Sequence, residues 1–212
     1  MMNGTTLDSI VPRQGSGRKA NVIIKVASYS PDDTSKLYEY LKMSILDVNN
    51  WNSFKSGITF QPKLVDKNGR QVNRMAKIGD LMKILLPRWQ SVSRLYDWRE
   101  ITKIEERLDG NTEIFFITII PAASLEMEMT EPSHFLRPES SVTFCVVRDE
   151  HKLELQIHTR NEGLDNRMSG LKTRLQNAVM SVFIAGGFYE HQWSKLLKAI
   201  LKEGISRMKI SD

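Results

Sequence analysis

The densest group of chemically active side chains in this sequence is the stretch HTRNEGLDNR, from His158 to Arg167. Such a group can form the rim of a pocket for an anionic head group, with an arginine as a bidentate donor. It can also be a turn between a strand and a helix, in which Asp165 or Asn166 caps the helix. We favour the turn, because the stretch lies where the last predicted strand meets the last predicted helix.

Other side chains give little support for catalysis by a metal, a nucleophile or a nucleotide cofactor. The four histidines lack the i, i+4 spacing of a helical zinc pair, and Cys145 is the single cysteine. The sequence contains no G-x-S-x-G motif, no phosphate-binding glycine loop and no dinucleotide fingerprint. Asp97 and Glu100 flank Trp98, but carboxylates beside an aromatic residue are common at strand ends. We therefore expect no metal, no cofactor and no catalytic residue.

The composition is typical of a globular protein with one large domain or at most two small ones. The chain has 212 residues, of which 41% are hydrophobic and 26% are charged. No window approaches the roughly 18 apolar residues that a membrane helix needs. The first twenty residues lack the apolar segment of a secretory signal, and a single cysteine excludes an internal disulfide. We expect a cytoplasmic protein.

The net charge is +5, and basic residues gather in the N-terminal stretch and near the C-terminus. A nucleic-acid surface would combine such a patch with stacking aromatic residues or a known motif, and neither is present. We interpret the C-terminal basic residues as the solvated face of an amphipathic helix, and we expect no nucleic-acid or membrane partner. These residues are Lys195, Lys198, Lys202, Arg207 and Lys209.

The N-terminal part of the chain predicts a flexible tail over residues 1–20, followed by a strand over residues 21–28 that is rich in β-branched residues. The sequence SPDDTSKLYEYLKMSIL then predicts a short amphipathic helix, with Pro31 and two aspartates in its first turn. A second short helix or a turn follows, with Trp51 and Phe54 directed inward.

Six further strands are predicted in succession, and tight turns such as Asn68-Gly69 connect them as an antiparallel meander. In the last strand, Leu153, Leu155 and Ile157 are expected to form an apolar inner face. The alternating polar residues are expected to form a solvated outer face, and these are Lys152, Glu154, Gln156, His158 and Arg160. The predicted strands cover residues 58–65, 80–87, 97–108, 112–121, 140–149 and 151–160.

The chain ends in a long helical segment, from about Leu171 to Met208, that two adjacent glycines interrupt. Gly186 and Gly187 are expected to end one helix and let a second begin, because glycine accepts left-handed dihedral angles. The interruption is either a fixed kink or a hinge that lets the second helix lift and admit a ligand. We favour the fixed kink.

This element order resembles the helix-grip fold of the START and birch-pollen-allergen superfamily, known as SRPBCC. In that superfamily a curved seven-stranded antiparallel sheet wraps a long C-terminal helix, and two short helices follow the first strand. The stretches DWREITKIEE, VTFCVVR, RNE and HQW resemble uncharacterised bacterial proteins more closely. The resemblance implies a single α+β domain over residues 21–212, although the superfamily's last helix is typically unbroken.

The resemblance also implies a cavity between the sheet and the C-terminal helix that is suited to a small apolar or amphipathic molecule. Eight residues are candidates to line it, although aromatic residues can equally fill a closed core. They are Phe60, Trp98, Phe115, Phe144, Thr159, Phe183, Phe188 and Trp193.

Three functions compete at this stage. The first is non-catalytic binding of such a ligand. The second is an enzyme of the cyclase or hydratase kind, which needs a polar residue on the concave face of the sheet. The third is a protein-interaction module that uses the basic C-terminal helix. Candidates for the polar residue are Arg99, Glu100, Thr102 and Thr159.

Overall fold

Seven antiparallel strands form one curved sheet in the computed structural model of the chain, which describes residues 9–26, 30–55, 57–87, 96–123, 125, 136–165 and 186–210. The spatial order is β1-β7-β6-β5-β4-β3-β2, so that β2 to β7 form a meander and β1 pairs with β7. The strands are β1 (Arg18–Val26), β2 (Gln61–Val65), β3 (Leu81–Leu85), β4 (Tyr96–Asp109), β5 (Thr112–Pro121), β6 (Ser141–Asp149) and β7 (Lys152–Glu162).

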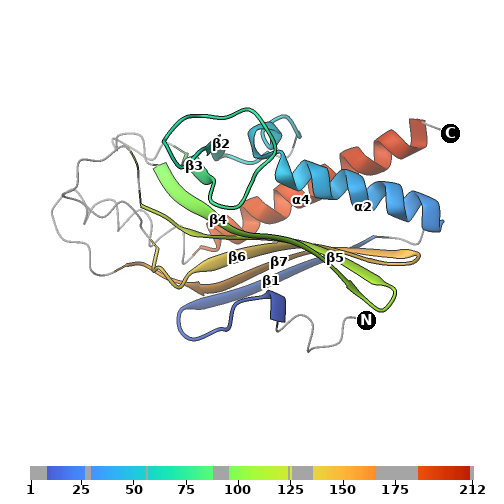
Figure 1. Cartoon of the computed structure of the whole chain (residues 1–212), viewed down its shortest axis with the longest axis horizontal. Coiled ribbons are helices and arrows are strands. Elements are labelled where there is room, and N and C mark those ends of the chain that lie inside the picture. Colours follow the sequence, from blue (N-terminus) through green and yellow to red (C-terminus); the bar gives the residue numbers. More distant parts are fainter. Residues whose placement is uncertain are drawn as a thin grey trace.

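Helices α2 (Pro31–Leu46) and α4 (Phe188–Ile210) lie on one face of the sheet, and the N-terminal segment runs along the other (Figure 1). We call the face toward the two helices the inner face and the opposite one the outer face. A single 3-10 turn, η1 (Val48–Asn50), follows α2. This arrangement is the α+β helix-grip fold that the element order predicts. None of the described helices is long and apolar enough to cross a membrane.

Helix α2 begins where the sequence provides capping groups. The Oγ atom of Ser30 accepts a hydrogen bond from the backbone N–H of Asp33 at 3.1 Å, and Pro31 follows the cap. At the other end, the indole N–H of Trp51 lies 3.2 Å from the carbonyl oxygens of Ser44 and Ile45. These carbonyls belong to the last turn of α2, so the buried Trp51 closes the helix.

Helix α4 has the amphipathic character that the sequence predicts. Trp193, Leu197 and Ile200 are buried in the core between the helix and the sheet, whereas Lys198 and Lys202 are exposed. Gly204 allows α4 to approach α2 closely, because a Cβ atom there would lie only 2.7 Å from Cδ1 of Tyr40. The segment from Leu171 to Phe183, in which the sequence predicts the first part of this helical region, lies outside the described residues.

The inner face of β7 confirms the predicted register. Leu153, Leu155 and Ile157 are each at most 2% exposed and belong to the main core. The alternation of side chains along a strand makes this placement sensitive to a slip of one residue, which would move all three to the outer face.

The outer face is covered more completely than the sequence suggests. Ile10 and Val11 are buried against Phe116 and Cys145, although they belong to the stretch predicted as a flexible tail. Residues 9–20 therefore depart from that prediction, and β1 already begins at Arg18. The physical reason is that β5 is apolar on both faces, so that its outer side chains need a cover that Ile10 and Val11 provide.

The polar side chains of β7 are a second correction, since Gln156 and His158 were expected to face solvent but are only 4% and 1% exposed. The Nδ1 atom of His158 lies 2.9 Å from Oδ1 of Asn21, and its Nε2 atom lies 2.9 Å from Oε1 of Gln156. Arg160 donates from Nη1 to the same Asn21 oxygen at 2.8 Å. Pairing with β1 thus buries Gln156, His158 and Arg160 in a hydrogen-bonded network instead of exposing them.

We predict that Leu155→Ala lowers the free energy of unfolding by about 2–5 kcal/mol, because Leu155 is fully buried and its truncation leaves a cavity. Urea denaturation measures the change. Lys152→Ala, on an exposed residue of the same strand, is the matched control and should change stability by less than about 0.5 kcal/mol. Equal stability of the two variants would contradict the assignment of Leu155 to the core.

We also predict that His158 makes the fold less stable under mildly acidic conditions. Burial, together with the positive charges of Arg160 and Lys19, lowers the pKa of His158 from 6.5 to about 4. Between these values the unfolded chain binds a proton that the folded chain does not, so stability falls as the pH falls from about 6.5 toward 4, by at most about 1.4 kcal/mol per pH unit.

The measurement compares the parent protein with His158→Gln by urea denaturation at about pH 7 and about pH 5. Glutamine retains hydrogen-bonding groups and does not titrate, so the variant should lose less stability on acidification than the parent. An identical loss in both proteins would show that His158 is not responsible.

Candidate functional site: a buried polar cluster under helix α4

Two oppositely charged residues of β4, Asp97 and Arg99, lie on the inner face of the sheet. Their cross-strand partners on β3 are Ile84 and Met82, which belong to the main core. Both charged side chains are at most 1% exposed. The Nε atom of Arg99 donates to Oδ2 of Asp97 at 2.7 Å. A charged pair with this degree of burial is stable only when further polar groups support it.

Tyr189, in the first turn of α4, provides part of that support. Its hydroxyl donates to Oδ2 of Asp97 at 2.7 Å, and its ring lies under the guanidinium of Arg99, with 4.9 Å between Cζ and the ring centroid. Tyr189 is 1% exposed. The start of α4 therefore covers the ion pair of β4, and the two elements meet through polar contacts as well as through the apolar core.

The position of Tyr189 depends on the turn that precedes it. Gly187 has a φ of +65°, which glycine adopts without strain, and its carbonyl accepts the backbone N–H of His191 at 3.0 Å. A left-handed Gly187 agrees with the predicted break before a second helix. In addition, Nη2 of Arg18 on β1 donates to Oε2 of Glu190 at 2.7 Å. The first turn of α4 is thus held to both β1 and β4.

A bulge in β7 brings a second carboxyl group to the same end of the inner face. Ala20 pairs with Thr159 but Arg18 pairs with Glu162, so the register shifts across this interval, and Asn161 has a φ of +55°. Glu162 is 5% exposed. Burial raises its pKa, and the positive charges of Arg99 and Arg18 oppose this effect.

The protonation states in the cluster follow from its contacts. Burial and the neighbouring Asp97 carboxylate raise the pKa of Tyr189 well above its ordinary value, so this hydroxyl stays protonated and acts as a donor. Burial disfavours the charge of Arg99, but Asp97 more than compensates, and the pKa of Arg99 is raised. The Asp97–Arg99 pair is thus a charged pair with no net charge.

The cluster also leaves hydrogen-bonding capacity unused. Within the part of the chain that the structure describes, Oδ1 of Asp97 and Nη2 of Arg99 are buried and have no hydrogen-bond partner. The indole Nε1 of Trp193, one turn further along α4, is also buried without a hydrogen-bond partner among the described residues. Buried polar atoms are nearly always paired in folded proteins, so an unpaired acceptor and an unpaired donor on adjacent side chains indicate a place for a ligand or a water.

Several residues predicted to line a cavity are packed against one another. The ring of Trp193 lies 4.6 Å from that of Phe60 and 5.3 Å from that of Phe144, measured between centroids. Phe115 is buried in the same core. These four aromatic residues therefore fill space between α4 and the sheet.

The remaining predicted residues lie in other places. Thr159 is buried on the inner face of β7, and the half-buried Phe188 contacts the ring of Tyr189, with centroids 5.5 Å apart. Trp98 alternates with Asp97 and Arg99 and so lies on the outer face, in a small cluster with Val65. Phe183 lies outside the described residues.

Among the polar candidates for the concave face, Arg99 and Thr159 are on it and Glu100 and Thr102 are not. Glu100 is the cross-strand partner of Leu81 on the outer face, and Thr102 occupies a bulge where its hydroxyl donates to the carbonyl of Thr118 at 3.3 Å. Sequence reasoning missed the partnership of Asp97 with Tyr189. The usable signal was the i, i+2 spacing of Asp97 and Arg99, which places both on one face of a strand.

The stretch from His158 to Asp165 holds the N-terminal segment, a role that the sequence did not indicate; the helix that Asp165 or Asn166 was expected to cap would begin in residues 166–185, outside the described residues. The side chain of Asn161 accepts the backbone N–H of Gly15 at 2.6 Å and donates to the carbonyl of Arg13 at 3.0 Å. This stretch thus fixes the N-terminal segment against the sheet. The described residues contain no group of three or more histidine, cysteine, aspartate or glutamate side chains that is arranged to hold a metal ion.

Comparisons with known proteins find similarity in fold only. No family model and no curated protein matches the sequence. Among solved structures, Ara h 8.0201 is 14% identical with a TM-score of 0.41, over 89% of this chain and 99% of that one. Human STARD10 is 11% identical with a TM-score of 0.41, over 90% of this chain and 66% of that one. A protein of unknown function from Staphylococcus aureus is 12% identical with a TM-score of 0.41, over 88% and 96%. Similarities this distant do not assign a function.

We predict that Gly187→Ala destabilises the protein by more than the strain of a left-handed alanine, which is about 1–2 kcal/mol. A Cβ atom at Gly187 would lie 2.6 Å from Nη2 of Arg18 and would disturb its ion pair with Glu190. The matched control is Gly110→Ala, because Gly110 has a φ of +62° and no atom lies within 4 Å of its added Cβ. Thermal denaturation of both variants measures the difference. Equal losses would mean that the contact with Arg18 contributes nothing.

Proposed function

We propose that this protein is a non-catalytic binding module for a small amphipathic molecule, which lies between the inner face of the sheet and α4. The observation that carries the proposal is the pair of unpartnered buried atoms, Oδ1 of Asp97 and Nη2 of Arg99. When no ligand is bound, each of these atoms is buried without a hydrogen bond, which lowers the stability of the fold by about 1–3 kcal/mol. A polar head group between them would remove both costs.

The charge of the cluster selects the kind of head group. Because Asp97 and Arg99 neutralise each other, a carboxylate ligand would meet Arg99 favourably but would be repelled by Asp97. A hydroxyl or an amide both donates and accepts, so it can bond Asp97 and Arg99 together without introducing charge. We therefore infer an uncharged head group of this kind.

The apolar part of the ligand would contact residues that adjoin the cluster. Ile101 follows Arg99 on the inner face of β4 and pairs with Ile119 of β5, while Phe188 lies beside Tyr189. Thr159 remains in the proposed lining, whereas Phe115, which pairs with Glu106 toward the far end of β4, belongs to the packed core. Phe60, Phe144 and Trp193 contact one another, so we assign them to the packed core.

An enzyme of the hydratase or cyclase kind is the second candidate, and one observation favours it. Oδ1 of Asp97 is a buried carboxylate oxygen without a hydrogen-bond partner among the described residues, and such an oxygen can accept a proton from a bound substrate. The two functions differ in what becomes of the ligand. A bound molecule that is recovered unchanged after prolonged incubation supports the binding module, and its conversion supports the enzyme.

The expected partner is thus a small molecule rather than a nucleic acid or a membrane. The exposed lysines Lys198 and Lys202 lie on α4 opposite its buried residues, as on any amphipathic helix, and we assign them no partner. We retain the cytoplasm as the proposed location on the ground of the single cysteine.

We predict that decanol binds at the cluster about ten-fold more tightly than decyl methyl ether, which accepts but cannot donate a hydrogen bond. Isothermal titration calorimetry measures both affinities. Decanoate has the same chain with a charged head and should bind more weakly than decanol. Equal affinities for decanol and the ether would overturn the proposed site.

The variant that tests the residues is Asp97→Leu combined with Arg99→Met. Removing Arg99 alone would leave a buried unpaired carboxylate and destabilise the fold by about 3–5 kcal/mol, whereas the double variant removes both charges. It should bind decanol and the ether equally.

Native mass spectrometry of the protein purified from its own host then identifies the natural ligand, which should be an apolar molecule with a hydroxyl or amide group.

A further inference from the structure

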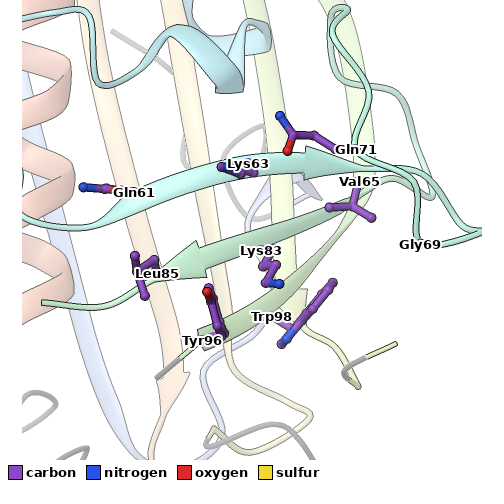
Figure 2. A pocket seen from close by; sticks show the side chains of 9 residues that line it. All are labelled: Gln61, Lys63, Val65, Gly69, Gln71, Lys83, Leu85, Tyr96 and Trp98. Carbon is purple, nitrogen blue, oxygen red and sulfur yellow. The ribbon is translucent and has the colours of Figure 1, made fainter. Parts of the chain in front are cut away.

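Residues 9–17, which we call the strap, cover the apolar part of the outer face. Ile10 and Val11 are buried against a patch on β5 and β6. The patch consists of Ile114, Phe116, Cys145 and Val147. The outer face over β2, β3 and β4 contains instead a pocket of about 340 Å³, and no residue of the strap lines it (Figure 2). The strap thus excludes water from one apolar patch and leaves the pocket uncovered.

The remainder of the strap is held mainly by one side chain of β7, that of Asn161. Its Oδ1 atom accepts the backbone N–H groups of Gly15 and Ser16 at 2.6 and 3.2 Å. Its Nδ2 atom donates to the carbonyl oxygen of Arg13 at 3.0 Å. In return, Oε1 of Gln14 accepts the backbone N–H of Asn161 at 3.0 Å. One amide side chain therefore organises the strap where it passes β7.

This attachment is weaker than that of a strand within the sheet. Residues 11–17 form no helix or strand, and none of the residues from Pro12 to Gly17 is buried. Ordering each of them costs conformational entropy, whereas only Ile10 and Val11 contribute buried apolar surface. Terminal segments with so few buried contacts open locally at a lower free energy than the whole fold requires.

The C-terminal end of the strap leads directly to the polar cluster. Gly17 has a φ of +82°, and a Cβ atom there would lie only 2.6 Å from the carbonyl oxygen of Glu162. Asn161, which binds the strap, has a φ of +55° and belongs to the same bulge of β7. Arg18 follows the strap, and its ion pair with Glu190 helps to hold the first turn of α4. Movement of the strap therefore affects the bulge and the start of α4 together.

We propose that residues 9–17 form a releasable strap, which opens while the rest of the fold stays intact and which, when closed, restrains the first turn of α4 over the polar cluster. Displacement of Ile10 and Val11 at the outer face then loosens the cover of the inner face, although α4 does not lift as a unit. The device consists of the protein's own contacts, so it does not depend on which ligand the inner face binds.

Cys145 reports the opening of the strap, because it is the single cysteine and is buried with Ile10 and Val11. Burial raises the pKa of its thiol to about 12, and iodoacetamide reacts with the thiolate, so alkylation is slow while the strap is closed. Ile10→Ser should raise the rate of alkylation by about ten-fold or more, because serine loses the apolar contact. The matched control is Ile23→Ser, on a half-exposed isoleucine of β1 outside the patch, which should change the rate by less than about two-fold.

Two further variants separate local opening from unfolding of the whole chain. Leu155→Ala destabilises the main core without touching the strap. If Cys145 reacted only in the unfolded chain, this variant would raise the rate by about thirty-fold or more, whereas we expect less than about two-fold. Asn161→Gly keeps the left-handed backbone without strain but removes the amide that binds the strap, so it should raise the rate by about ten-fold. Faster alkylation of Leu155→Ala than of Ile10→Ser would overturn the proposal.

Hydrogen exchange with detection by mass spectrometry tests the restraint on α4. In Ile10→Ser, the backbone amides at the start of α4, such as that of His191, should exchange about three-fold faster or more than in the parent. Exchange in α2, which lies on the opposite face of the sheet from the strap, should stay unchanged, and Ile23→Ser should resemble the parent throughout (Figure 1). Unchanged exchange at the start of α4 in Ile10→Ser would refute the restraint, even if Cys145 became reactive.

Discussion

The burial of an ion pair on the inner face of β4 is the constraint around which the start of α4 is organised. Asp97 and Arg99 are almost fully excluded from solvent, and each would be strongly unfavourable there alone. Their mutual contact removes only part of the desolvation cost. A further part is offset by the Tyr189 hydroxyl, which bonds the carboxylate, and by the aromatic face beneath the guanidinium. The position of α4 is therefore determined by charge as well as by apolar packing.

Strand β4 separates two kinds of chemistry by simple alternation. Its inner side chains, Asp97 and Arg99, form a pair with no net charge, whereas its outer side chains, Tyr96 and Trp98, lie next to Lys83 of the neighbouring strand β3. Because successive side chains of a strand point to opposite faces, four consecutive residues serve both surfaces.

Local sequence patterns were sufficient to predict the order of the described strands and helices. The capping residues before α2, the apolar positions of β7 and the left-handed Gly187 before α4 depend on neighbours within a few residues, and each appears in the structure as predicted. The polar cluster was not accessible in the same way. Tyr189 and Asp97 are 92 positions apart, and no periodicity indicates which polar residue of a helix meets which residue of a strand.

The two corrections on the outer face have the same physical origin. Alternation predicts that the polar side of β7 meets water, but it carries no information about what else covers that side. Asn21 of β1 is the cross-strand partner of His158, and the N-terminal segment packs against Asn161 further along β7. Polar residues of a kind that usually faces solvent thereby find their hydrogen-bond partners within the protein. The same covering explains why Ile10 and Val11 lie in a packed layer.

These contacts also bear on whether Gly187 acts as a hinge. If α4 lifted from the sheet as a unit, Tyr189 would leave Asp97, Glu190 would leave Arg18, and Trp193 would leave its aromatic neighbours. The ion pair of β4 would then lose the hydroxyl and the ring that stabilise it, in addition to the apolar contacts of the helix. Close packing of Gly204 against α2 restrains the other end of α4. The left-handed turn at Gly187 is therefore best understood as a fixed geometric requirement, which directs the first turn of α4 onto the charged pair and keeps it there.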